Sequence, residues 1–183
     1  MRFCVSLLSL TLLFLAACGQ REALDYAFTI NNVSVRNAYQ SLDIRIQQQL
    51  ELSSEARAAL EHGVTLTIRL ELELRNDSNV IVTHRDDRRY QLRYLPLSEY
   101  YQLAEERTGE LKTYSRLRHM LASMGDFNVQ LSTGPLTSGG YELRTRISLE
   151  ESRLPTPMQL PAWFSSQWRH DSEWSVWPFK VSV

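Results

Sequence analysis

The chain has 183 residues, 43% of them hydrophobic, and a formal net charge of −1 at pH 7. This length suits one domain that buries a substantial core. The near balance of acidic and basic side chains argues against nucleic acid as a partner, because nucleic-acid-binding domains usually carry a basic excess.

The first seventeen residues are predicted to be an export signal. Arg2 precedes an apolar run from Phe3 to Ala17, and Arg21 follows soon after the run ends. A positive start, a short apolar stretch and small residues at its end are typical of a secretory signal. The run is also shorter than the roughly 20 apolar residues that a membrane-spanning helix needs. We therefore expect residues 1–17 to be removed.

The end of this signal resembles the bacterial lipobox, because Leu15-Ala16-Ala17 precedes Cys18. The resemblance implies cleavage between Ala17 and Cys18 and acylation of the Cys18 thiol, including by palmitate. An ordinary signal with an incidental cysteine is the alternative. A single acyl chain holds a protein only marginally, but the several chains of a bacterial lipoprotein hold it firmly. We expect a lipoprotein of the cell envelope that faces the periplasm, and Gly19 favours the outer over the inner membrane.

Residues 18–23 are predicted to be a short lipidated tether, followed by a single β-rich domain over residues 24–183. Extended, such a tether spans at most about 20 Å. Cys4 leaves with the signal and Cys18 is consumed by lipid, so the mature domain has no cysteine pair for a disulfide. Packing alone must then stabilise the fold.

Strands dominate the pattern that follows. Val64–Arg75 alternates strictly between apolar and polar residues, which predicts a strand with one solvated face, as in an antiparallel sheet. Shorter alternations predict further strands, and turn residues such as Asn76-Asp77 and Thr108-Gly109 separate several of them. These shorter candidates are Tyr26–Ile30, Leu42–Ile46, Tyr90–Tyr94, Tyr100–Glu105, Leu111–Tyr114 and Tyr141–Glu150.

Two helices are predicted between the strands. Ser53 or Ser54 can cap a helix over Glu55–His62, with Gly63 just beyond its end. Ser115 can cap a second helix over Arg116–Met124. The second helix carries one apolar face, which we expect to pack on the core; insertion into a membrane is the alternative. That face consists of Leu117, Met120, Leu121 and Met124.

The tail from Leu154 is rich in proline and aromatic residues. Its prolines are expected to break regular structure. A short helix is predicted over Ala162–Trp168, and a last strand over Trp174–Val183. Pro178 is expected to place this strand near a sheet edge. Tryptophans supply much of the energy of binding surfaces, although they can equally close the end of a core. The candidate partner-binding residues are Trp163, Trp168, Trp174 and Trp177.

No catalytic or metal-binding set is predicted. The four histidines lack the i, i+4 spacing of a helical zinc site, and each is expected at the surface. His84-Arg85-Asp86 matches the start of a kinase catalytic loop, but Gln91 replaces the asparagine that the motif requires. Adjacent or alternate carboxylates are expected on solvated strand faces or loop ends: Glu71/Glu73, Glu105/Glu106 and Glu150/Glu151.

Several segments together resemble a family of uncharacterised exported proteins of Gram-negative bacteria, classed as a domain of unknown function. They are the export signal, the long alternating strand, Arg89–Tyr94, Arg153–Pro157, Trp168 and the Trp174–Trp177 pair. The resemblance spans most of the mature chain and implies no catalytic residue.

We expect a mostly β protein, an antiparallel β-sandwich of about seven to nine strands with two or three short helices; an α+β fold is the fallback. The expected role is a non-enzymatic module without cofactor, which is tethered to the membrane through Cys18 and binds an envelope protein. An envelope structural or lipid-handling protein is the alternative, followed by a glycan-binding or hydrolytic one.

Overall fold

The strand with the strictest alternation, β3 (Leu66–Asn76), lies inside the larger of two antiparallel sheets. The structure is a computed structural model that describes residues 27–82 and 86–182. The predicted signal, the cleavage site at Ala17 and Cys18, and the tether lie outside the described residues.

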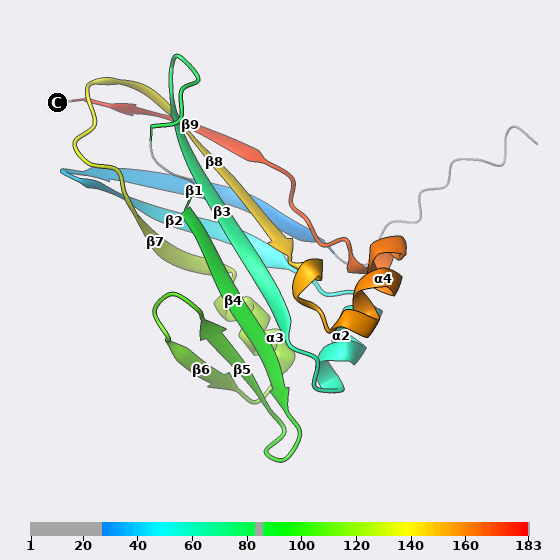
Figure 1. Ribbon diagram of the computed structural model, residues 1–183. Coiled ribbons are helices and arrows are strands. Elements are labelled where there is room, and N and C mark those ends of the chain that lie inside the picture. The colour runs from blue at the N-terminus through cyan, green and yellow to red at the C-terminus, as the bar shows by residue number, and fades with distance from the viewer. Residues whose placement is uncertain (1–26, 83–85, 183) are drawn as a thin grey trace, which may run out of the picture.

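The described strands form a sandwich of one six-stranded and one three-stranded sheet (Figure 1). All pairs within them are antiparallel, and helices gather at one end of the sandwich. The larger sheet has the order β6 (Leu111–Tyr114), β5 (Tyr100–Glu105), β4 (Asp86–Leu95), β3, β8 (Gly139–Leu149), β9 (Ser175–Val181). The smaller has the order β1 (Phe28–Ala38), β2 (Ser41–Leu50), β7 (Asp126–Ser132). The predicted antiparallel β-sandwich is confirmed.

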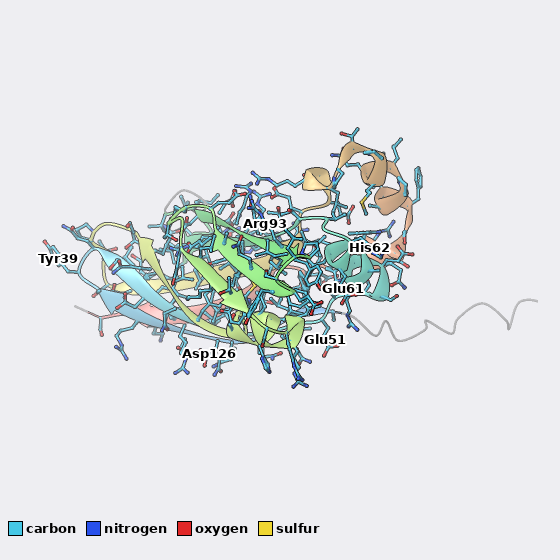
Figure 2. The ribbon with its side chains drawn as sticks, turned by 90° about the horizontal axis from the view of Figure 1, so that it is seen from below. Tyr39, Glu51, Glu61, His62, Arg93 and Asp126 are labelled. Carbon is cyan, nitrogen blue, oxygen red and sulfur yellow. The ribbon has the colours of Figure 1, made fainter. Side chains whose placement is uncertain are left out.

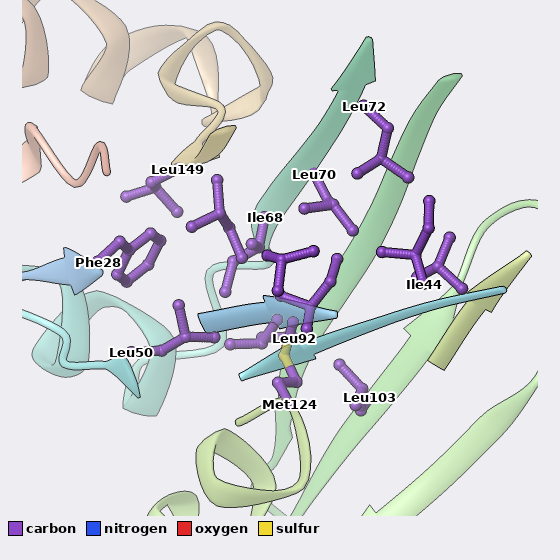
Figure 3. Packing of buried hydrophobic residues seen from close by; sticks show 14 of the residues in the cluster. Phe28, Ile44, Leu50, Ile68, Leu70, Leu72, Leu92, Leu103, Met124 and Leu149 are labelled. Carbon is purple, nitrogen blue, oxygen red and sulfur yellow. The ribbon is translucent and has the colours of Figure 1, made fainter. Parts of the chain in front are cut away.

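The core lies between the two sheets. The apolar residues of β3 are fully buried, and they belong to one cluster with the inward residues of β2, β7 and β8 (Figure 3). Burying each such leucine or isoleucine contributes about 1.5–3 kcal/mol. The inward residues of β3 are Leu66, Ile68, Leu70, Leu72 and Leu74.

The smaller sheet contains a strand that the sequence analysis missed. β7 alternates Phe127, Val129 and Leu131, and it pairs with β2 so that Val129 lies opposite Ile44. Its alternation was available in the sequence, but the segment follows directly on the predicted helix that ends at Met124. The pairing completes the wall that covers the inner face of β3.

Helix α2 (Ser54–Glu61) follows the prediction closely. The Ser53 side chain caps it by accepting a 3.1 Å hydrogen bond from the Ala56 N–H, and Gly63 after its end has φ +87°. The position just beyond a helix C-terminus often has a left-handed backbone, which glycine adopts without strain.

Helix α3 (Leu117–Ser123) differs at its start. The predicted cap Ser115 is wrong, because Arg116 stands at the N-cap in an extended conformation and makes no capping side-chain bond. Met120 and Met124 are buried, which confirms the core-facing orientation, whereas Leu117 and Leu121 stay half-buried at the surface.

The proline-rich segment is helical, contrary to the prediction. After a short 3₁₀ turn, η2 (Glu151–Arg153), helix α4 covers Thr156–Phe164, and a second 3₁₀ turn, η3, covers Ser166–Trp168. Pro157 lies in the first turn of α4, where no intrahelical N–H is required. Pro161 lies inside the helix and removes one N–H donor there. Because its first turn tolerates Pro157, α4 can begin at Thr156, six residues before the predicted start at Ala162.

The outer face of β3 is not solvated, which corrects a second expectation. Glu71 and Glu73 are buried although they point away from the core. Arg75 reaches Glu73 at 2.6 Å, and Arg144 from β8 reaches it at 3.4 Å. The long arginine side chains of the neighbouring strand cover these carboxylates with their aliphatic stems.

Candidate functional site

An open groove lies at the helical end of the sandwich, between α2 and α3. It encloses about 600 Å³, and the last residues of β2 and the loop after it form part of its wall. Leu50 and Leu52 are buried beneath it, and Leu117 and Leu121 of α3 line one side. Pockets that hold ligands span roughly 300–1,000 Å³ and are mostly apolar.

Charged side chains surround this apolar groove. Glu51 and Arg57 line it, as do Glu61 from the end of α2 and Arg118 from α3. Figure 2 shows Glu51 and Glu61 at the same end of the molecule. The Tyr101 hydroxyl lies 3.4 Å from a Glu61 oxygen, and burial together with this carboxylate raises the pKa of Tyr101. The groove therefore offers an apolar floor with both signs of charge at its rim.

The wall of the groove is held in place by a buried amide. Gln48 of β2 donates from its side chain to the Met124 carbonyl at 2.8 Å, and its backbone N–H donates to the Gly125 carbonyl. A β-carbon on Gly125 would lie 3.1 Å from the Gln48 carbonyl oxygen, so glycine allows the close approach. These contacts fix the end of α3 against β2.

The four tryptophans occupy different environments. Trp168 is 5% exposed and packs in the core, so it offers little surface to a partner. Trp177 is half-buried on the inward side of β9 and donates its indole N–H to the Thr145 hydroxyl at 3.0 Å. Trp174 is half-buried with the Arg144 guanidinium 5.2 Å from its ring. Trp163 alone among the four is largely exposed, at 68%.

Trp163 is part of an exposed apolar surface on α4. Leu160, Trp163 and Phe164 are all largely exposed, and the rings of Trp163 and Phe164 lie 5.9 Å apart. Residues three and four apart share one side of a helix. Trp163 was predicted at a binding surface, whereas Leu160 and Phe164 were not, although their i, i+3, i+4 spacing in the sequence places all three on one side of a helix.

A smaller, polar pocket of about 240 Å³ lies where β4 and β5 meet β7 and α3. Arg88 reaches across it to donate a 2.6 Å hydrogen bond to the Gln130 carbonyl, and Asp86 lies 3.2 Å from the same guanidinium. Burial raises the pKa of Tyr90, beside it, to about 12. Arg88 thus joins the two sheets, with its charge paired by Asp86.

His170 is buried, which corrects the expectation of a surface histidine. Its ring lies 5.1 Å from that of Phe28, and Nε2 accepts a hydrogen bond from a backbone N–H of the loop before α2. Burial lowers its pKa. His62 and His119 are exposed as expected, and His84 lies outside the described residues.

The other predicted carboxylate pairs are separated by the fold. Glu105 faces Arg88 on the inner side of the larger sheet, at 4.0 Å, whereas Glu106 pairs with Arg153 on the outer side. Glu150 binds Arg89 at 2.9 Å. Asp86, from the kinase-like triplet, binds Arg88 and Arg107. Within the described residues, no three His, Cys, Asp or Glu side chains group closely enough to hold a metal ion.

A family model described as "Domain of unknown function (DUF4390)" matches residues 26–178. No curated protein matches the chain. Across residues 27–82 and 86–182, none of the helices is long and apolar enough to pass through a bilayer.

Proposed function

The chain belongs to the DUF4390 family of unknown function, and on that premise we propose that it is a lipid-anchored, non-enzymatic module that binds a protein partner in the bacterial cell envelope. The binding site is the groove between α2 and α3. The observation that carries the proposal is the combination of an apolar floor with a rim of both charges at this groove.

The chemistry of the groove favours a protein segment as its occupant. Apolar side chains of an amphipathic segment would fill the space above Leu50 and Leu52, between the sides of the two helices. Charged residues on the same segment would meet Arg57 and Glu61, which lie one turn apart on α2, and Arg118 on α3. Complementary rim charges mainly set specificity and the rate of association.

The lipid at Cys18 supports this role. An anchored module meets partners of the same membrane at a high local concentration, so a groove of modest affinity suffices. We place the protein on the periplasmic side, and on the outer membrane in preference to the inner one because Gly19 follows Cys18.

Site-specific photo-cross-linking in cells tests the proposal. A photoreactive residue at Glu51, after β2, and another at Arg118, on α3, should both yield the same discrete adduct. A third at the exposed Lys180 on β9 should not. Adding Leu117→Arg and Leu121→Arg to each variant should abolish the adduct.

The controls separate lost binding from lost folding. Leu117 and Leu121 are only half-buried, so the double variant should retain its thermal unfolding transition. Failure to form a shared adduct from Glu51 and Arg118, or persistence of the adduct in the folded double variant, would contradict the proposed site.

A further inference from the structure

The outward side of α4 is a surface without charge. The sequence Thr156–Phe164 contains no acidic or basic residue. Leu160 is 67% exposed, and Phe164, one turn further on, is 81% exposed. Exposed apolar surfaces of this kind mark contact with a partner or a membrane.

The opposite side of α4 packs against the domain. Ala162 is fully buried and Met158 is half-buried against the core. The one amide of the helix, Gln159, turns back and donates to the carbonyls of Ser152 and Leu154. These contacts hold α4 against the domain and keep Gln159 on its inner side, while Leu160, Trp163 and Phe164 are exposed on the other.

This surface lies at the end of the molecule where the described chain begins (Figure 1). The Ala27 carbonyl accepts a 2.9 Å hydrogen bond from the Glu51 N–H, at the start of the loop before α2. The residue after α4, Ser165, bonds Glu55 in the first turn of α2 at 3.2 Å. The start of β1 and the end of α4 are therefore both attached to the same short stretch of chain.

The length of chain before Ala27 limits how far this end can lie from a lipid on Cys18. Nine residues, 18–26, precede Ala27, and they span about 30 Å at most when extended. A domain anchored there therefore keeps its helical end, and α4 with it, within reach of the bilayer.

We infer that the Leu160–Trp163–Phe164 side of α4 inserts into the interface of the lipid bilayer. The inference rests on the lipid anchor of the proposed function. Tryptophan and phenylalanine rings favour the boundary between head groups and acyl chains. Together with the anchor, this contact gives the domain one fixed orientation on the membrane.

In this orientation the sandwich stands away from the bilayer. Tyr39, in the turn between β1 and β2, lies at the end opposite the helices (Figure 2). The 11 residues of β1 separate it from the start of that strand, a distance of about 35 Å for an extended strand. The turn at Tyr39 therefore stays in water.

Fluorescence quenching on the intact lipoprotein tests the inference. The mature chain has no cysteine other than Cys18, so Leu160→Cys or Tyr39→Cys introduces a single free thiol for an environment-sensitive dye. Each acylated variant is reconstituted into phosphatidylethanolamine–phosphatidylglycerol vesicles. The two quenchers are brominated lipid, which acts inside the bilayer, and iodide, which acts in water.

Brominated lipid should quench the label at position 160. Iodide should quench this label at least threefold less than it quenches the label at position 39. Adding Trp163→Ser and Phe164→Ser should restore quenching of the position-160 label by iodide, while the protein keeps its thermal unfolding transition. Equal iodide quenching at both positions, with the protein still on vesicles, would overturn the inference and leave the anchor intact.

Two further outcomes would also overturn it. Shielding from iodide without quenching by brominated lipid would mean that protein, such as a second copy, covers α4. Failure of the acylated protein to sediment with vesicles would remove the lipid anchor and with it both the inference and the membrane part of the proposed function.

Discussion

The backbone N–H of Ser53 donates a 2.9 Å hydrogen bond to Nε2 of His170, 117 residues later in the chain. Because Nε2 accepts, the ring is neutral and its proton lies on Nδ1. Ser53 also caps α2 and donates its hydroxyl to the Gln167 carbonyl at 2.6 Å. One residue therefore joins the start of α2 to the segment that follows α4.

Stability should depend on pH through His170. Burial lowers its folded-state pKa below the ordinary 6.5, so protonation favours the unfolded state. The stabilisation is complete above pH 6.5 and is lost as the pH falls through the lower folded-state pKa. Urea unfolding between pH 7.5 and 5.5 should show a falling free energy of unfolding.

The matched variant is His170→Gln, which keeps a side-chain acceptor but does not titrate. Its free energy of unfolding should change less over the same pH range than that of the parent chain. Identical pH slopes for the two proteins would rule out His170 as the titrating group.

Removing the buried carboxylate of Glu73 should destabilise the protein. Glu73→Ala leaves Arg75 and Arg144 without their shared partner. These arginines are partly exposed and can regain water, so we expect a loss of about 1–3 kcal/mol rather than the full cost of an isolated buried charge. Chemical denaturation measures it.

Glu142→Ala, on the neighbouring strand β8, provides the control on the same face of the sheet. Glu142 is exposed on β8 opposite Arg75, and an exposed substitution of this kind changes stability by less than about 0.5 kcal/mol. Equal losses in the two variants would show that burial of Glu73 has no energetic consequence.

Arg88 should stabilise the contact between the two sheets. Arg88→Met keeps much of the side-chain volume but removes the hydrogen bond to the Gln130 carbonyl and one of the two arginine partners of Asp86. We expect a loss of about 1–3 kcal/mol in the free energy of unfolding. Arg93→Met, at an exposed position of the same strand, should be nearly neutral; a neutral Arg88→Met would refute the role of this contact.

Local patterns predicted those elements whose folding depends on near neighbours. Tyr100–Glu105 and Leu111–Tyr114 were predicted with the bounds that β5 and β6 have, because a turn with glycine separates two short alternating runs. The capping serine and following glycine likewise located α2.

Features created by distant parts of the chain could not be predicted in this way. Glu71 has the alternation of a solvated position, but Arg69 and Arg146 cover it, and Arg146 comes from a strand that pairs only in the folded sheet. His170 is buried because Phe28 and Ser53 meet it from the other end of the sequence. The groove has the same origin, since its walls come from β2, α2 and α3.

The proposed function depends first on the lipid at Cys18, and fractionation of cells that express Cys18→Ser tests it most directly. The parent protein should sediment with membranes and resist a high-salt wash. The variant should appear mainly in the soluble periplasmic fraction, because the α4 surface alone gives only weak, reversible membrane contact. Full retention of the Cys18→Ser protein on washed membranes would contradict the lipid anchor.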